Sequence, residues 1–184
     1  MELNKKKVLI GTVGYHNLSN HSVGPVLFPN LKDMDWPNGI EIEEMNWGPI
    51  AIVQQFQAMS EPYERVVLLT AIENAHRQTG DITLHHWLGG VPDDDEVHAR
   101  IGDAVTGVIS PENLLIIGEY FKIWPKEVYL VDVEPGPEKA GMTLTSAVAR
   151  RIPEILTTVR RISLRGASLQ DKLNFLTGST LIAN

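Results

Sequence analysis

The sequence contains no cysteine. This absence excludes a disulfide framework, a zinc site built from thiolates and a cysteine nucleophile. Basic residues are also scarce, because 16 lysines and arginines stand against 23 aspartates and glutamates, for a net charge of -7 at pH 7. No segment concentrates basic and aromatic side chains, as a nucleic-acid-binding surface would. We therefore expect no nucleic-acid partner.

Long apolar runs are missing as well. No window of the sequence approaches the roughly 18 apolar residues that a transmembrane helix needs, so we expect no membrane partner. Near the N-terminus, a basic stretch leads into a short apolar run that no small-residue cleavage site follows. This run is too short for a signal peptide. The sequence therefore predicts a cytoplasmic protein.

Two common catalytic and nucleotide-binding motifs are absent. No Gly-x-Ser-x-Gly elbow is present, which argues against a hydrolase of the Ser-His-Asp type. Gly11, Gly14 and Gly24 lack the spacing of a dinucleotide-binding loop. The loop after the first apolar run instead carries histidine, asparagine and serine, so we do not interpret it as a dinucleotide-binding loop.

The apolar residues that are present predict an α/β fold. The chain has 184 residues, of which 43% are hydrophobic, which suits one globular domain with a full core. Continuous β-branched runs indicate inner strands, buried on both faces, at residues 8–13, 66–69 and 128–133. Alternating segments at residues 39–47 and 81–89 indicate outer strands. We predict a five-stranded mixed sheet sandwiched by helices on both faces.

Helical signals lie between these strands. Ser110 as N-cap, Pro111 at the first helical position and Glu112 behind it predict a helix start. A long helix is predicted over residues 143–163, with a kink at Pro153. Pro29 is expected to cut or kink a short helix after the first strand. Residues 91–107 are polar without a clear period, and we interpret them as a connecting loop with some helix.

The last segment, residues 163–184, follows the last predicted helix. Its leucines at positions 169, 173 and 176 suggest a partner surface or a docked cap. Because the predicted sheet and its helices are complete before this segment, we expect the fold to form without it.

Candidate functional residues lie where the strands end. In an open α/β sheet the ligand site lies beyond the carboxyl ends of the strands, which here are followed by residues 14–21, 70–76 and 134–137. Histidines and carboxylates in these segments and at the helix start could hold Zn²⁺ or Ni²⁺, although a solvated loop residue is the commoner role for any one of them. These residues are His16, His21, Glu73, His76 and Glu112. His85 and His86 cannot chelate one ion together, because adjacent side chains of a strand point to opposite faces.

The order of these parts resembles that of the hydrogenase maturation endopeptidases, which trim the C-terminus of the nickel-iron hydrogenase large subunit. The most specific match is the segment PKEVYLVDVEPGPEKAGMTLTSAVARRIPEILTTV, and AIENAHRQTGDI matches a second family stretch, with Thr79 and Gly80 in place of Pro-Gly. The resemblance covers about residues 7–162. It implies a phosphorylase/hydrolase-like α/β domain over residues 1–162 and a C-terminal extension over residues 163–184.

The resemblance also implies a metal site. The family contacts metal through a Glu in the first loop, an Asp at the end of the third strand and a His at a helix start. The matching positions here are His21, Thr70 and Glu112. One imidazole and one carboxylate thus remain with their places exchanged, while Glu73 could substitute for Thr70 if the chain turns there. The implied ion is Ni²⁺ carried by the substrate, or Zn²⁺.

Two functions follow from this resemblance. The first is a maturation protease that recognises a nickel-loaded large-subunit precursor and cleaves its C-terminal extension. The second is a pseudopeptidase, a catalytically inactive member that binds a protein partner as an assembly factor, since a fold does not fix a function. The Thr at position 70 favours the second, because a divalent ion would need the charge that a carboxylate supplies there.

Overall fold

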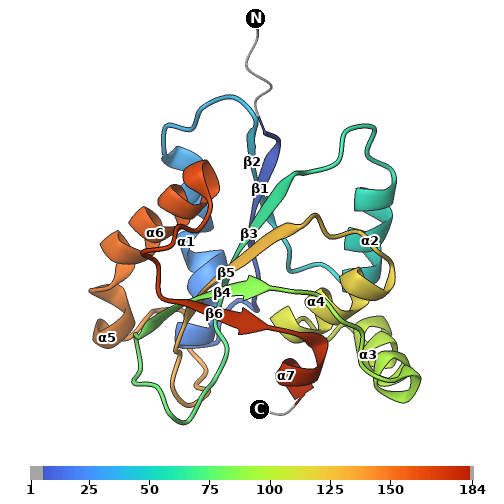
Figure 1. The fold of residues 1–184 in the computed structure, drawn as a ribbon. Helices are drawn as coiled ribbons and strands as arrows, with labels where there is room; N and C mark the ends of the chain where they lie inside the picture. The colour runs from blue at the N-terminus through green and yellow to red at the C-terminus, as the bar shows by residue number, and fades with distance from the viewer. Residues whose placement is uncertain (1–5, 183–184) are drawn as a thin grey trace, which may run out of the picture.

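Residues 6–182 are described by a computed structural model, in which helices flank both faces of one six-stranded sheet (Figure 1). The strand order is β2-β1-β3-β5-β4-β6, and β4 runs antiparallel to β5 while the other neighbouring pairs are parallel. The mixed α/β sheet is therefore confirmed. The strands are β1 (Val8–Thr12), β2 (Ile40–Glu44), β3 (Arg65–Thr70), β4 (Ile82–Trp87), β5 (Glu127–Val133) and β6 (Leu173–Leu176).

The three predicted inner strands are confirmed as β1, β3 and β5. Every residue of β1 and β3 is buried, and β5 is buried after its first residue, because helices cover the sheet from both sides. On one face lie α1 (Val23–Asp33), α5 (Ser146–Ala149) and α6 (Ile152–Arg165). On the other lie α2 (Pro49–Gln57), α3 (Asp94–Val105), α4 (Pro111–Tyr120) and α7 (Gly178–Ile182).

The predicted strand count of five is wrong, because β6 adds a sixth strand beside β4. Its residues belong to the segment that the sequence assigns to an extension. The physical reason is that β4 pairs with β5 on one side only, which leaves a row of backbone N–H and C=O groups for another strand. Residue 163 itself lies within α6. Residues 1–5 of the predicted domain and 183–184 of the predicted extension lie outside the described residues.

Two helices, α3 and α4, begin at a residue whose side chain caps the first turn. The predicted start at Ser110 is confirmed, since its hydroxyl accepts a hydrogen bond from the backbone of Asn113. Residues 91–107 are more helical than expected: α3 begins after Asp93, whose carboxylate accepts from the Glu96 amide. The predicted long helix is split into α5 and α6 before Pro153, whereas α1 continues through Pro29. No helix within residues 6–182 is both long and apolar enough to cross a membrane.

Candidate functional site

The candidate site lies at the carboxyl edge of the parallel strands β1, β3 and β5. The segments that leave these strands there are residues 13–22, 71–81 and 134–145. The first segment is shaped by Gly14, whose φ of 143° favours glycine. A Cβ at this position would lie 2.8 Å from the carbonyl oxygen of His21, so the backbone can fold back to His21 only over a glycine.

Asn20 fixes this first loop to the segment that follows β5. Its side-chain amide donates to the carbonyl of Pro135 at 2.8 Å, and its oxygen accepts from the backbone of Thr145 at 2.9 Å. The backbone of Ser19 adds a bond to the carbonyl of Gly141 at 2.8 Å. Asn20 is therefore a buried structural residue that holds its neighbour, His21, at the edge of the sheet.

His21 and Glu73 form the one direct contact among the four predicted metal-contacting residues. The Nε2 atom of His21 lies 2.8 Å from Oε1 of Glu73. Because an ionised carboxylate only accepts hydrogen bonds, the imidazole donates from Nε2. The His21 side chain is 16% exposed and that of Glu73 is 56% exposed. Nδ1 of His21 is buried and has no hydrogen-bond partner among the described residues.

Thr70 does not face solvent as a free ligand. It is fully buried at the end of β3, and its hydroxyl donates to Oδ1 of Asp132 at 3.2 Å on the paired strand β5. A carboxylate therefore does lie beside Thr70, supplied by the neighbouring strand. Asp132 was not found from the sequence, although a charged residue within an apolar strand is rare enough to be a usable signal.

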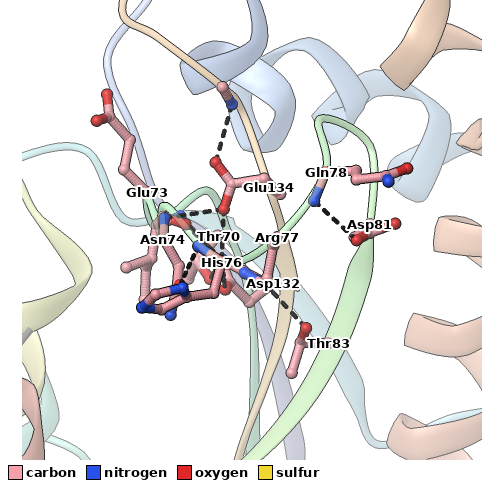
Figure 2. A network of polar contacts seen from close by, with 12 residues as sticks. Thr70, Glu73, Asn74, His76, Arg77, Gln78, Asp81, Thr83, Asp132 and Glu134 are labelled. Atoms are coloured by element: carbon pink, nitrogen blue, oxygen red, sulfur yellow. Dashed lines mark hydrogen bonds and ion pairs between the residues drawn. The ribbon is translucent and has the colours of Figure 1, made fainter.

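Arg77 joins this aspartate to a second buried carboxylate, that of Glu134 (Figure 2). Its Nη2 atom lies 2.7 Å from Oδ2 of Asp132 and 3.2 Å from Oε2 of Glu134. Its Nη1 atom donates to the hydroxyl of Thr83 at 3.0 Å. One guanidinium thus neutralises much of the charge of two carboxylates, which makes Asp132 a poor candidate for a metal ligand.

His85 and His86 point to opposite faces of β4, as predicted. Nε2 of His85 lies 3.5 Å from Oδ2 of Asp132, whereas His86 stacks on Tyr129 with ring centroids 4.8 Å apart. His85 lines a cavity of about 220 Å³ next to the Arg77 ion pairs. Leu176 and Leu181 form another wall of this cavity, so the C-terminal segment contributes to its lining.

Glu112 lies in the first turn of α4, and within residues 6–182 it makes no hydrogen bond or ion pair with His21. Tyr15 ties the first loop to the connection before this helix, since its hydroxyl donates to Gly107 at 3.1 Å and accepts from the Ile109 amide at 2.6 Å. In the described part of the chain, no group of three His, Asp or Glu side chains could hold a metal ion. An imidazole and one carboxylate alone do not fit a resident four-coordinate Zn²⁺.

No protein-family model matches the sequence, and no curated protein sequence matches it. Solved structures do match its fold. The hydrogenase maturating endopeptidase HybD from E. coli superimposes with a TM-score of 0.61 and 21% identity, over 83% of this chain and 89% of its own. The hydrogenase 2 maturation peptidase from a Thaumarchaeota archaeon gives 0.57 and 19%, over 88% and 100%. The maturation protease HycI from Thermococcus kodakarensis gives 0.59 and 16%, over 86% and 94%. The chain therefore has the fold of the hydrogenase maturation endopeptidases.

Proposed function

We propose that the protein is a hydrogenase maturation protease-like protein of the cytoplasm, which recognises and cleaves the C-terminal extension of a nickel-iron hydrogenase large-subunit precursor. The observation that carries this proposal is the His21–Glu73 pair. It lies at the sheet edge where α/β proteins bind their ligands, on a fold that maturation endopeptidases share.

In this proposal the metal arrives with the substrate. His21 and Glu73 supply one imidazole and one carboxylate. In the free protein Nε2–H of His21 donates to Glu73, and a shared Ni²⁺ would take the place of that proton between the two side chains. Glu112, at the start of α4, is the candidate for a further contact when the precursor is bound. A nickel ion contacted in this way would polarise the scissile carbonyl or its attacking water.

The second candidate function is that of a pseudopeptidase, which binds the precursor without cleaving it. One specific observation favours it: the hydroxyl of Thr70 donates to Asp132, and the charge of Asp132 is paired with Arg77. Asp132 therefore does not replace the strand-three Asp of the family pattern as a free carboxylate. The two functions share a partner and differ in turnover.

The test is to mix the protein with a nickel-loaded large-subunit precursor that carries its C-terminal extension, and to follow the mass of the precursor. A loss of mass at the C-terminus is the expected result for a protease. Binding without a loss of mass would identify a pseudopeptidase. The matched control is a precursor truncated at the cleavage point, whose mass should not change. If neither precursor binds to the protein or changes mass, both functions are excluded.

A further inference from the structure

Glu73 lies in a segment without regular secondary structure, yet its backbone is fixed on both sides. The amide of Ile72 donates to Oδ1 of Asp132 at 2.9 Å. The amide of Asn74 donates to Oε2 of Glu134, also at 2.9 Å. Ile72 and Asn74, the two neighbours of Glu73, are therefore both bound to carboxylates of the β5 region. Asp132 lies in β5, and Glu134 directly follows it. Such bonds remove backbone freedom that a loop otherwise keeps.

The side chain of Arg77 closes the same segment from its other end. Besides its ion pairs with Asp132 and Glu134, it donates from Nη2 to the carbonyl oxygen of Ile72. The segment from residue 72 to residue 77 is thus a closed loop, fastened to the sheet at three points. Figure 2 shows Glu73 extending away from these ion pairs, so its carboxylate stays available to His21.

Burying two carboxylates at this place has no evident benefit for the core. Asp132 is 1% exposed and Glu134 is 3% exposed. Buried ion pairs often stabilise a fold no more than apolar residues of the same size would, because both charges lose their hydration. Among the described residues, most hydrogen bonds and ion pairs of these two carboxylates go to residues 72–77. The others go to Thr70, His85 and the Gly136 amide.

We infer that Asp132 and Glu134 are positioning residues, which act through Arg77 and the 72–77 segment to hold the carboxylate of Glu73 against Nε2 of His21. The held carboxylate accepts a hydrogen bond from Nε2–H and so keeps the imidazole of the free protein in one tautomer and one orientation, with Nδ1 unprotonated. The inference deepens the proposed function, on which its use in maturation rests, because it concerns the same site. The geometry itself is independent of any cleavage.

The test is nitrogen NMR of the His21 imidazole at about pH 8.5, where an ordinary imidazole is neutral. The wild type is expected to hold the Nε2–H tautomer, and Glu73→Ala defines the signal of a released imidazole. Asp132→Asn and Glu134→Gln should lower the ratio of the Nε2–H to the Nδ1–H tautomer by about tenfold, as expected when a hydrogen bond to a charged group is loosened. Arg77→Lys should lower it less, since it keeps the charge but not the forked geometry.

The matched control is Glu127→Gln at the opposite end of β5. It removes an ion pair with Arg65 and so tests whether a general loss of stability moves the tautomer. An unchanged ratio in folded Glu134→Gln and Arg77→Lys proteins would overturn the inference, as would an equal change in the control. If Asp132→Asn does not fold, these two variants still decide it. A shifted tautomer in a protein that neither binds nor cleaves the precursor would leave the inference standing and remove the proposed function.

Discussion

Asn20 and His21 are neighbours in the chain, but their side chains have different roles. That of Asn20 is enclosed and bonds to residues 135 and 145, whereas that of His21 meets Glu73 at the edge of the sheet. The sequence identified His21 because the carboxyl ends of strands collect functional loops. It paired His21 with Glu112, since a linear sequence does not tell in which direction the loop after β3 turns. Asp132 was missed because it lies within an apolar strand pattern, whereas Glu134 lies in a segment expected at the site but was not named as a candidate.

At this residue scale we predict that Ni²⁺ or Zn²⁺ binds weakly at His21 and Glu73. The variant His21→Ala should abolish that binding, because the imidazole is the only nitrogen ligand of the pair. Its cost in the free energy of unfolding should be about 1 kcal/mol or less. Titration calorimetry and a thermal melt measure the two effects.

Asn20→Ala is the comparison for stability, where a larger effect is expected. It should cost about 1–3 kcal/mol, because it leaves buried backbone groups of residues 135 and 145 without their partner. Equal metal uptake by wild type and His21→Ala would remove the metal proposal.

At the scale of elements, β6 and α7 connect the C-terminal segment to the sheet. β6 pairs with β4 over four residues, and Leu176 and Leu181 are buried against the rest of the core. No strand was predicted here, because a four-residue strand carries too few residues for a period to be recognised. In contrast, the Ser110 helix start was predictable, since a cap and a proline act through the adjacent backbone alone.

We predict that deletion of residues 168–184 leaves a folded, cooperative protein of lower stability. The loss should be about 3–5 kcal/mol, the amount expected from exposing two leucine side chains and their contacts. Urea unfolding measures it. Leu176→Ala should lower the free energy of unfolding by about 2–4 kcal/mol. Leu169→Ala, at a fully exposed position, should leave it unchanged. A deletion variant that melts without cooperativity would show that the segment is part of the core.

At the scale of the whole molecule, two carboxylates with lowered pKa values make the free energy of unfolding depend on pH in the acidic range. Burial raises the pKa of Glu127, but hydrogen bonds and charges from Lys6 and Arg65 outweigh it and hold that pKa below its ordinary value of 4.5. The backbone amide of Ser168, with Arg161 beside it, lowers the pKa of Asp171 below 3.8. These contacts join β3 to β5 and α6 to the segment before β6.

A carboxylate whose pKa is lowered in the folded protein stabilises it above the pKa of the unfolded chain. We therefore predict that the free energy of unfolding is constant down to about pH 5 and falls as the pH drops through 4.5 and 3.8 toward the folded values. Urea unfolding between pH 7 and pH 3 measures it. The double variant Glu127→Gln, Asp171→Asn should be less stable at pH 7 and should lose less on acidification. A parallel decline in both proteins would contradict this assignment.

β6 also determines how the sheet behaves toward other copies of itself. At the opposite edge, β2 carries Glu41, Glu43 and Glu44, whose like charges oppose pairing with a second sheet. β4 has no such protection: its sequence ITLHHW is rich in residues that favour strands and carries no carboxylate or lysine. Proteolytic nicking between α6 and β6 would release the cover of this edge. The consequence would be a six-residue edge at β4, open to pairing with another chain, in place of the four-residue edge of β6.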